Sequence, residues 1–237
     1  MRVLVTRPQP DAERTGARVA ALGHEAVIAP VTRIVATGAP PPAAPWDGLI
    51  VTSAHALPAV LDLTKTRPLF AVGARTAQKA REAGFAEVHE GAGDAARLVD
   101  LVRGTLAPGA SLLHPTGRDR KPEPERSLRG AGYTLTLWEC YAAEPVRALP
   151  EQVVADLGAG RIAVAFHYSR RSAALARERA AEAGVSGPFS ALRHLCLSDD
   201  VASALTDLRV EVAAQPTEAA LLALLGEAGA ESPPRSR

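Results

Sequence analysis

The sequence predicts an α/β protein with two similar lobes, each a parallel sheet flanked by helices, joined by a two-stranded connector. Three observations predict this fold. Short apolar or β-branched runs alternate with amphipathic helical patterns, which is typical of parallel sheets covered on both faces. The order of strand, polar loop, helix and strand recurs later in the chain. Proline-rich segments interrupt both copies at the same structural point.

The first copy of this pattern begins at the N-terminus. RVLVT predicts a strand over residues 2–6, and DAERTGARVAALG predicts an amphipathic helix over residues 11–23. EAVIAPVTRIVA predicts a second strand over residues 25–36. Further along, GLIVTS and LFAVG predict two more strands, each followed by a helical pattern. Such continuously apolar strands indicate a sheet that is buried on both faces.

The internal repeat covers most of the chain. The first pair of matching segments has the same order of elements, a strand, a polar loop, a helix, a small turn and a strand, at an offset of roughly 109 residues. The matching segments are 3–32 with 111–141, 49–63 with 164–178, and 69–102 with 195–225. The repeat predicts two equivalent sets of elements.

A cut into two consecutive halves conflicts with the positions of the prolines. TGAPPPAAPW follows the second strand of the first copy, and AAEPVRALPE follows its counterpart. If each such strand continues out of its sheet, the two extensions can cross together between two lobes. We therefore expect one lobe over residues 37–143 and the other from residues 1–36 with 144–228. Residues 229–237 lack apolar periodicity and are expected to form a disordered tail.

The composition favours a globular protein. The chain is 47% hydrophobic with a formal net charge of +1, and no apolar run has the length of a membrane span. We expect no nucleic-acid or membrane partner, so local groups must hold any anionic ligand. The N-terminal residues lack the features of a signal peptide, which predicts a cytoplasmic location. Cys140 and Cys196 lie in apolar runs, which favours buried thiols over a disulfide or a nucleophile.

Polar residues at the predicted strand ends are the candidate ligand-binding groups. In open parallel sheets, ligands bind at the carboxyl ends of strands, where helix N-termini favour anions. The candidates at these ends are Thr6, Arg7, Ser53, Gly73, Thr76, Gly117, Arg118, Tyr168, Ser169, Arg170 and Ser198. Taken singly, each hydroxyl also fits a helix N-cap and each arginine a solvated charge. Their recurrence in both lobes favours a cleft for a ligand with several carboxylates.

Other chemistries lack their usual motifs. The chain has no GxGxxG after a strand, no GxxxxGK[ST] and no GxSxG, so dinucleotide binding, phosphoryl transfer and serine hydrolysis are not predicted. The histidines are scattered without a paired metal-ligand spacing, and His24 is expected at the surface. The sequence therefore predicts neither a metal nor another cofactor.

Five segments stand in a particular order along the chain: VLVTRP, DGLIVTSAHAL, AVGARTAQKAREAGF, CYAAEP and AAQPTEAALLALL. In this order they resemble the uroporphyrinogen-III synthase family, from Arg2 to about Gly226. The resemblance implies an enzyme that takes the linear tetrapyrrole hydroxymethylbilane, removes water, and closes the ring with the last pyrrole inverted. It also implies two α/β lobes, a monomer, and no cofactor or metal.

The resemblance assigns roles to three residues. Tyr141, at the crossover CYAAEP, matches the family's tyrosine and is the expected general acid for departure of the hydroxyl. Thr76, in AVGARTA, and Ser53 are expected to bind carboxylates of a substrate rich in them. The uncatalysed bilane closes to the uninverted isomer, so positioning of the substrate is expected to decide the product.

Two segments depart from the family pattern. LSDDVA stands where the family reads G-P-T-T-A, so Val201 lacks the expected hydroxyl. FHYSRRSA replaces F-T-S-x-S-A, with Tyr168 and Arg170 as substitutes. These departures leave a second interpretation, a tetrapyrrole-binding or regulatory module of the same fold without turnover. A third, a generic two-lobed binder of small molecules, accounts for the cleft but not for the ordered segments.

Overall fold

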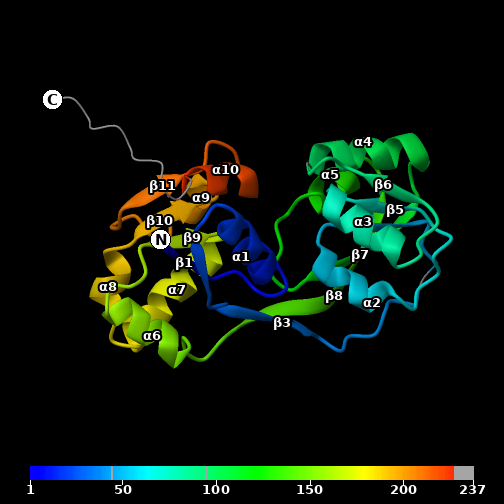
Figure 1. Cartoon of the computed structure of the whole chain (residues 1–237). Coiled ribbons are helices and arrows are strands. Elements are labelled where there is room, and N and C mark those ends of the chain that lie inside the picture. Colours follow the sequence, from blue (N-terminus) through cyan, green and yellow to red (C-terminus); the bar gives the residue numbers. More distant parts are fainter. Residues whose placement is uncertain (44, 94, 227–237) are drawn as a thin grey trace. The chain divides into compact units, whose positions relative to one another are not determined.

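The chain folds into two compact units, each with its own sheet. The computed structural model describes residues 1–43, 45–93 and 95–226. Unit 1 comprises Met1–Arg33 and Glu144–Arg237, and unit 2 comprises Ile34–Ala143. The expected disordered tail over residues 229–237 lies outside the described residues. Each unit is described by itself below (Figure 1).

Unit 1 contains a five-stranded parallel sheet in the order β11-β10-β9-β1-β2. Its strands are β1 (Arg2–Val5), β2 (Glu25–Ile28), β9 (Val164–His167), β10 (Arg193–Cys196) and β11 (Val210–Val212). Its helices are α1 (Asp11–Ala21), α6 (Glu151–Gly158), α7 (Arg170–Glu182), α8 (Ser186–Ser190), α9 (Asp199–Ala202) and α10 (Glu218–Ala223). Val3 in β1 pairs with Ala26 on one side and with Val164 on the other.

Consecutive residues of β1 face opposite cores, as the pleat of a strand requires. Val3 packs with Val19 of α1 and Leu221 of α10. Leu4 belongs to the other core cluster, which includes Val153 of α6 and residues of α7 and α8. The unit therefore has a central sheet with helices on both faces, which explains why its inner strands are apolar throughout.

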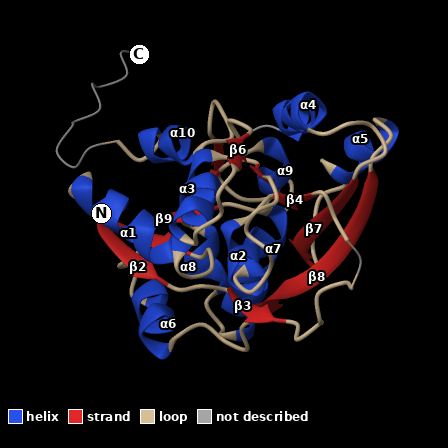
Figure 2. Ribbon diagram, turned by 90° about the vertical axis from the view of Figure 1, so that its right-hand side faces the viewer, coloured by secondary structure: helices blue, strands red, loops and turns tan. Residues whose placement is uncertain are grey.

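Unit 2 contains a six-stranded sheet in the order β3-β8-β7-β4-β5-β6. Its strands are β3 (Thr32–Ala36), β4 (Gly48–Val51), β5 (Leu69–Ala71), β6 (Val88–Glu90), β7 (Ser111–Gly117) and β8 (Thr134–Pro145). Its helices are the 3₁₀ turn η1 (Ala54–Ala56), α2 (Leu57–Val60), α3 (Ala74–Glu82), α4 (Ala95–Thr105) and α5 (Glu125–Gly130). Figure 2 shows β8, β7 and β4 side by side in this sheet.

The two sheets repeat the same order of equivalent strands. The pairs are β1 with β7, β2 with β8, β9 with β4, β10 with β5, and β11 with β6. In unit 2, Leu49 and Val51 of β4 pack towards α2 and α3, while Ile50 packs towards α4 and α5. The α/β class and the parallel sheets flanked by helices, both predicted from the sequence, are confirmed.

The run predicted as one strand over residues 25–36 forms two strands, so that prediction was wrong. β2 ends at Ile28, and β3 begins at Thr32. Pro30 lies between them and has no N–H to donate to a sheet. The residues on either side of it do donate: the N–H of Ala29 to the carbonyl of Val5, and the N–H of Val31 to the carbonyl of Thr6. The chain then enters a different pairing, with β8.

β3 is the antiparallel member of the unit 2 sheet. The N–H of Thr37 donates to the carbonyl of Cys140, and the N–H of Val146 donates to that of Val31. Partners in β8 thus have falling numbers as those in β3 rise, which defines an antiparallel pair. Both passages of the chain between the units lie within these two strands.

Candidate active site

In each sheet there is one pair of neighbouring parallel strands from which the chain adds further strands in opposite directions across the sheet. In unit 1 this pair is β1 and β9, and in unit 2 it is β4 and β7. The loops that leave such a pair of strands diverge to opposite faces of the sheet, which opens a crevice at their carboxyl ends. Two sets of polar residues surround these positions, and we call them the Tyr141 site in unit 2 and the Arg7 cluster in unit 1.

The Tyr141 site consists of Ser53, His55, Gly117 and Tyr141. Tyr141 lies opposite Gly117 because the register of β7 with β8 shifts there: Thr116 pairs with Glu139, but Gly117 pairs with Tyr141. Cys140 is therefore the extra residue of a β-bulge, a device that re-aims the following side chain. A Cβ atom on Gly117 would lie 2.8 Å from the Tyr141 ring, so only glycine fits beside this tyrosine.

The surroundings of Tyr141 keep its hydroxyl protonated. Burial raises the pKa of Tyr141 above its ordinary value. Hydrogen bonds of the phenol group with the Ser53 side chain and with the Gly117 backbone oppose this rise in pKa. The His55 ring lies 5.9 Å from the Tyr141 ring, centroid to centroid. A phenol in this setting is a hydrogen-bond or proton donor at neutral pH.

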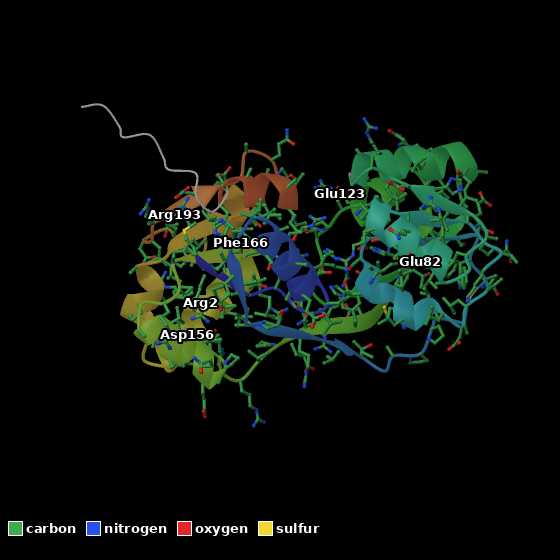
Figure 3. The ribbon with its side chains drawn as sticks, in the orientation of Figure 1. Arg2, Glu82, Glu123, Asp156, Phe166 and Arg193 are labelled. Atoms are coloured by element: carbon green, nitrogen blue, oxygen red, sulfur yellow. The ribbon has the colours of Figure 1, made fainter. Side chains whose placement is uncertain are left out.

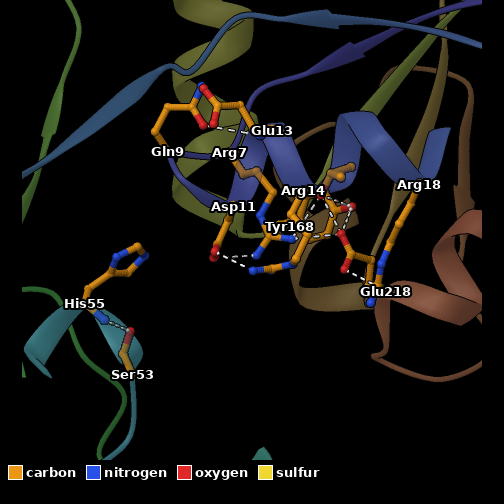
Figure 4. Close-up of polar contacts among 11 residues, drawn as sticks. Arg7, Gln9, Asp11, Glu13, Arg14, Arg18, Ser53, His55, Tyr168 and Glu218 are labelled. Carbon is orange, nitrogen blue, oxygen red and sulfur yellow. Dashed lines mark hydrogen bonds and ion pairs between the residues drawn. The ribbon is translucent and has the colours of Figure 1, made fainter. Parts of the chain in front are cut away.

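The polar residues around Tyr141 are held at the ends of β4 and β5. Ser53 caps η1, and its Oγ accepts the N–H of His55 at 3.3 Å (Figure 4). Gly73 is the extended residue before α3, with the Gly93 backbone 3.6 Å from the position of its absent Cβ. Thr76 is buried in the first turn of α3.

A buried histidine lies under the same pair of strands. The Nε2 atom of His114, in β7, lies 3.3 Å from Oγ1 of Thr52, which follows β4. Burial lowers the pKa of His114 to about 4, so the ring is neutral at physiological pH. Its Nδ1 atom has no hydrogen-bond partner among the described residues. His114 therefore links β7 to β4 as a neutral group and adds no charge there.

Arg118 follows Gly117 and is exposed at the end of β7. Its N–H donates to the carbonyl of Tyr141 at 3.0 Å, which fixes the backbone on both sides of the bulge. Arg120 is committed to an ion pair with Glu139 at 2.7 Å. The Arg118 side chain is an exposed cation at the end of β7.

The Arg7 cluster consists of Arg7, Asp11, Thr15, Arg18, Tyr168 and Glu218 (Figure 4). Arg7 follows β1, and its guanidinium lies 4.1 Å from the centre of the Tyr168 ring, which follows β9. The same guanidinium binds Asp11 Oδ2 at 2.9 Å and Glu218 Oε1 at 3.1 Å. The expected binding residues Arg7 and Tyr168 therefore meet at the strand ends, where they already hold two carboxylates.

Glu218 has the densest set of contacts in the cluster. Its Oε1 accepts from Thr15 Oγ1 at 2.5 Å and from the Tyr168 hydroxyl at 3.1 Å, and its Oε2 accepts from Arg18 at 2.7 Å. Burial raises the pKa of Tyr168 to about 12, and the nearby Glu218 charge adds to that rise. Sequence reasoning missed Glu218 and Thr15, because Glu218 has an ordinary position at the start of a helix, 211 residues from Arg7.

The remaining predicted residues of unit 1 have different environments. Thr6 is fully buried, and its hydroxyl donates to the Phe166 carbonyl at 3.1 Å, which ties β1 to β9. Ser169 caps α7 by accepting the N–H of Ser172. Arg170 is exposed, and Ser198 is a half-buried residue before α9. Val201, at the departure from the family pattern, is buried in a core cluster that includes Cys196 and Leu205.

Both cysteines are buried free thiols, as predicted. Burial raises the pKa of Cys140 and raises the pKa of Cys196 to about 11, so neither is an activated nucleophile. His24 is buried, contrary to the surface position predicted for it, because its ring contacts the Gly226 carbonyl and the N-terminal amine. Among the described residues, no group of three or more acidic, His or Cys side chains could hold a metal ion.

One charged cluster lies away from the strand ends. Asp156 of α6 is buried and binds Arg2, the first residue of β1, at 2.7 Å (Figure 3). Hydrogen bonds from Arg2 and Arg161 hold the pKa of Asp156 well below its usual range. Arg2 begins β1, so this cluster lies at the amino end of the strands, whereas the Arg7 cluster lies at their carboxyl end. The Asp156 cluster therefore has a structural role. No helix of the described chain is long and apolar enough to cross a membrane.

Comparison with known proteins gives a consistent result. A family model for uroporphyrinogen-III synthase (HemD) matches residues 13–225. The uroporphyrinogen-III synthetase of Helicobacter pylori superimposes with a TM-score of 0.59 at 15% identity, over 95% of this chain and 98% of that one. A mutant uroporphyrinogen III synthase of Thermus thermophilus superimposes with a TM-score of 0.53 at 18% identity, over 95% and 96%. At these identities the two structures establish the fold. No curated protein sequence matches the chain.

Proposed function

From the premise that the chain belongs to the uroporphyrinogen-III synthase family, we propose how its residues close the tetrapyrrole ring. The protein is a cyclising lyase of tetrapyrrole biosynthesis. Its substrate is hydroxymethylbilane, which loses water and closes with inversion of the last pyrrole. The observation that carries the proposal is the packing of Tyr141 against Gly117 at the end of β7. The strand order of the unit 2 sheet reverses between β7 and β4.

Tyr141 acts as the general acid for the first step. The hydroxyl of the hydroxymethyl group on the terminal ring leaves as water when the phenol proton is transferred to it, and the electron pair of the pyrrole nitrogen stabilises the resulting cation, a protonated azafulvene. The raised pKa of Tyr141 supports a protonated phenol before reaction. A phenol is a weak acid, so its contribution comes from placement within hydrogen-bond reach of the departing oxygen.

The neighbours of Tyr141 stabilise the phenolate that proton transfer creates. Hydrogen bonds with Ser53 and with the Gly117 backbone favour the charged form, since they lower the pKa that burial raises. The substituted carbon of the last pyrrole then attacks the azafulvene carbon to give a spiro intermediate. The original bond between that substituted carbon and its bridging methylene then breaks, which gives a second protonated azafulvene. The free α-carbon of the last pyrrole attacks this methylene, and the proton that it loses returns to the phenolate. Water is the only net product besides the ring.

Substrate carboxylates bind at the strand ends of both units. In unit 2 the proposed groups are Ser53, Gly73, Thr76, Gly117 and Arg118, and in unit 1 they are Arg7, Tyr168, Ser169, Arg170 and Ser198. Two observations support these assignments: the residues lie at the carboxyl ends of parallel strands or at the starts of the following helices, and Arg118 and Arg170 are exposed. Thr6 contributes from below, because its buried hydroxyl holds the ends of β1 and β9 together.

We also propose that the enzyme works as a cytoplasmic monomer. The two free, buried thiols support a reducing compartment. Monomers are usual in the family that the chain resembles. Light scattering coupled to size-exclusion chromatography tests the monomer, and a dimer mass at micromolar concentration would contradict it.

A coupled isomer assay tests the function. Hydroxymethylbilane is generated in situ, the protein is added, the products are oxidised, and the porphyrin isomers are separated. We expect the inverted isomer to dominate in proportion to the protein added. Formation of the uninverted isomer alone, at the rate seen without protein, would contradict the proposed function.

A further inference from the structure

The carboxylate of Glu218 fills a complete receptor. Four donors converge on it, and they come from three separate segments: Arg7 after β1, Thr15 and Arg18 on α1, and Tyr168 after β9. Both oxygens are used, three contacts on Oε1 and one on Oε2. The side chain retains only 15% of its exposure, and its contacts with Arg7, Thr15 and Tyr168 are partly buried, whereas the contact with Arg18 is exposed.

Three of the four donors, Arg7, Thr15 and Tyr168, are positioned by contacts other than those with Glu218. The Arg7 guanidinium is fixed by Asp11 at 2.9 Å and by the face of the Tyr168 ring. Thr15 is fully buried in α1. These positions depend on the sheet and on α1, and Glu218 enters from α10. Removing its carboxylate would thus leave Arg7, Thr15 and Tyr168 in place, in contact with one another (Arg7 Nη1 to Thr15 Oγ1 at 3.3 Å, Thr15 Oγ1 to the Tyr168 hydroxyl at 3.4 Å), but without their shared carboxylate acceptor.

The charge balance around the receptor favours another anion. Three guanidinium groups, of Arg7, Arg14 and Arg18, stand against two carboxylates, of Asp11 and Glu218, which leaves one positive charge. Glu218 is linked to α10 through a flexible side chain, so it can leave while the helix stays packed through Leu221. A carboxylate that arrives at these strand ends meets the same donors that Glu218 uses.

We propose that Arg7, Thr15, Arg18 and Tyr168 form a binding site for an acetate- or propionate-type carboxylate, and that Glu218 is its built-in occupant. A carboxylate side chain of the substrate displaces Glu218 from this site, so Glu218 acts as an intramolecular competitor. This identification of the ligand as a substrate side chain rests on the proposed function. The site itself and its preference for a carboxylate do not.

The first experiment measures binding of propionate by thermal unfolding. Glu218→Ala empties the receptor, and sodium propionate is compared with sodium chloride at equal ionic strength. We expect the melting temperature of Glu218→Ala to rise by about 3–6 °C at ten times the dissociation constant, with saturation. The wild-type protein should show a smaller rise, because Glu218 competes. Equal shifts in both proteins, or equal shifts with both salts, would overturn the proposal.

A double variant makes the test specific. Thr15→Val replaces the buried hydroxyl by a methyl group of the same shape, so Glu218→Ala/Thr15→Val keeps the cavity and loses one donor. Its shift with propionate should fall to less than half that of Glu218→Ala. Glu211→Ala serves as the matched control, because Glu211 binds a single guanidinium, that of Arg193, at 2.9 Å. A propionate shift as large in Glu211→Ala would contradict a built site.

The second experiment uses Glu218→Gln, which keeps the side-chain volume should the alanine variant fail to fold. Loss of an internal competitor should lower the KM for the bilane by at least twofold with kcat nearly unchanged. A raised KM would contradict displacement. Propionate binding without any inverted isomer would contradict the proposed function and leave the receptor standing. Inverted isomer with no propionate shift in any variant would contradict the receptor alone.

Discussion

Gly117 and Tyr141 are cross-strand neighbours that leave no room for a side chain on the glycine: a Cβ atom there would lie 2.8 Å from the Tyr141 ring and 3.1 Å from its hydroxyl oxygen. The contact depends on the bulge at Cys140, which brings the tyrosine opposite the glycine. The position of the phenol is thus set by the backbone of two strands and does not depend on a mobile loop.

Substitution of Gly117 tests that relationship. Gly117→Ala forces the Tyr141 ring to move, because real Cβ contacts of this length do not occur. We expect turnover to fall tenfold or more while the far-ultraviolet spectrum is retained. Gly130→Ala is the control, since among the described residues only its chain neighbours and the backbone of its own helix could lie within 4 Å of the added Cβ. Full activity of Gly117→Ala would mean that the placement of the ring is unimportant.

Removal of the Tyr141 hydroxyl tests the general acid. Tyr141→Phe keeps the ring and its packing, so we expect folding to be unchanged and kcat to fall tenfold or more. The isomer assay measures this. Tyr133→Phe is a matched control: its hydroxyl donates to the Leu106 carbonyl at 3.0 Å, so its loss should cost about 1 kcal/mol of stability at constant kcat. Equal kcat in both variants would exclude the catalytic role.

The buried histidine pair predicts loss of stability in acid. His167 and His194 lie 3.0 Å apart, Nε2 to Nδ1, and burial lowers the pKa of His167 to about 3. A folded-state pKa below the unfolded value of about 6.5 means that the unfolded chain binds more protons, so stability falls as pH drops below about 6.5. For His167 alone the loss between pH 7.5 and 5 is about 2 kcal/mol.

Urea titrations at the two pH values measure this loss. His167→Gln should reduce the difference in unfolding free energy between them by about 2 kcal/mol. His89→Gln removes a partly exposed histidine and leaves the buried pair intact, so the contribution of His167 to the difference should remain. An identical difference in both variants would show that other groups account for the acid response.

The Asp156 cluster predicts a variant that is unstable but active. Asp156→Asn removes the carboxylate that holds Arg2 and Arg161, so the melting temperature should fall. The isomer assay should show unchanged turnover per folded molecule, because the cluster lies at the amino end of the strands, away from the candidate active site at their carboxyl end. Asp207→Asn, which breaks an exposed pair with Arg177, should leave the melting temperature nearly unchanged. Loss of turnover in Asp156→Asn below its melting temperature would contradict a purely structural role.

Most of the fold was predictable because it follows from periodicity and repetition. Apolar strands between amphipathic helices specify the layers, and the internal repeat implies the shared strand order of the two sheets. The bulge at Cys140 was not predictable, since a one-residue shift of register leaves no mark in the alternation of β8. The break at Pro30 could have been read from the proline, but the apolar residues on both sides favoured a continuous strand.

The candidate site, too, was only partly predictable from the sequence. The sequence correctly placed Ser53, Gly117, Arg7 and Tyr168 at strand ends, and their role in binding stays a prediction. Sequence alone could not show that Arg7 and Tyr168 share Glu218, since that contact depends on how α10 returns to the sheet. Nor could it show that the Thr6 hydroxyl is spent on a backbone carbonyl, because a buried and an exposed threonine look alike in sequence.

The insertion of unit 2 between the two segments of unit 1 imposes an order on biosynthesis. β1 is an inner strand with two neighbours: β2 follows it closely in the chain, but β9 lies more than a hundred residues later, so one side of β1 must wait for its partner. Unit 2 is one continuous stretch, Ile34–Ala143, and is translated before β9. The inserted unit is therefore expected to fold first on the ribosome, while β1 can pair only with β2 and its other side stays unpaired until β9 arrives.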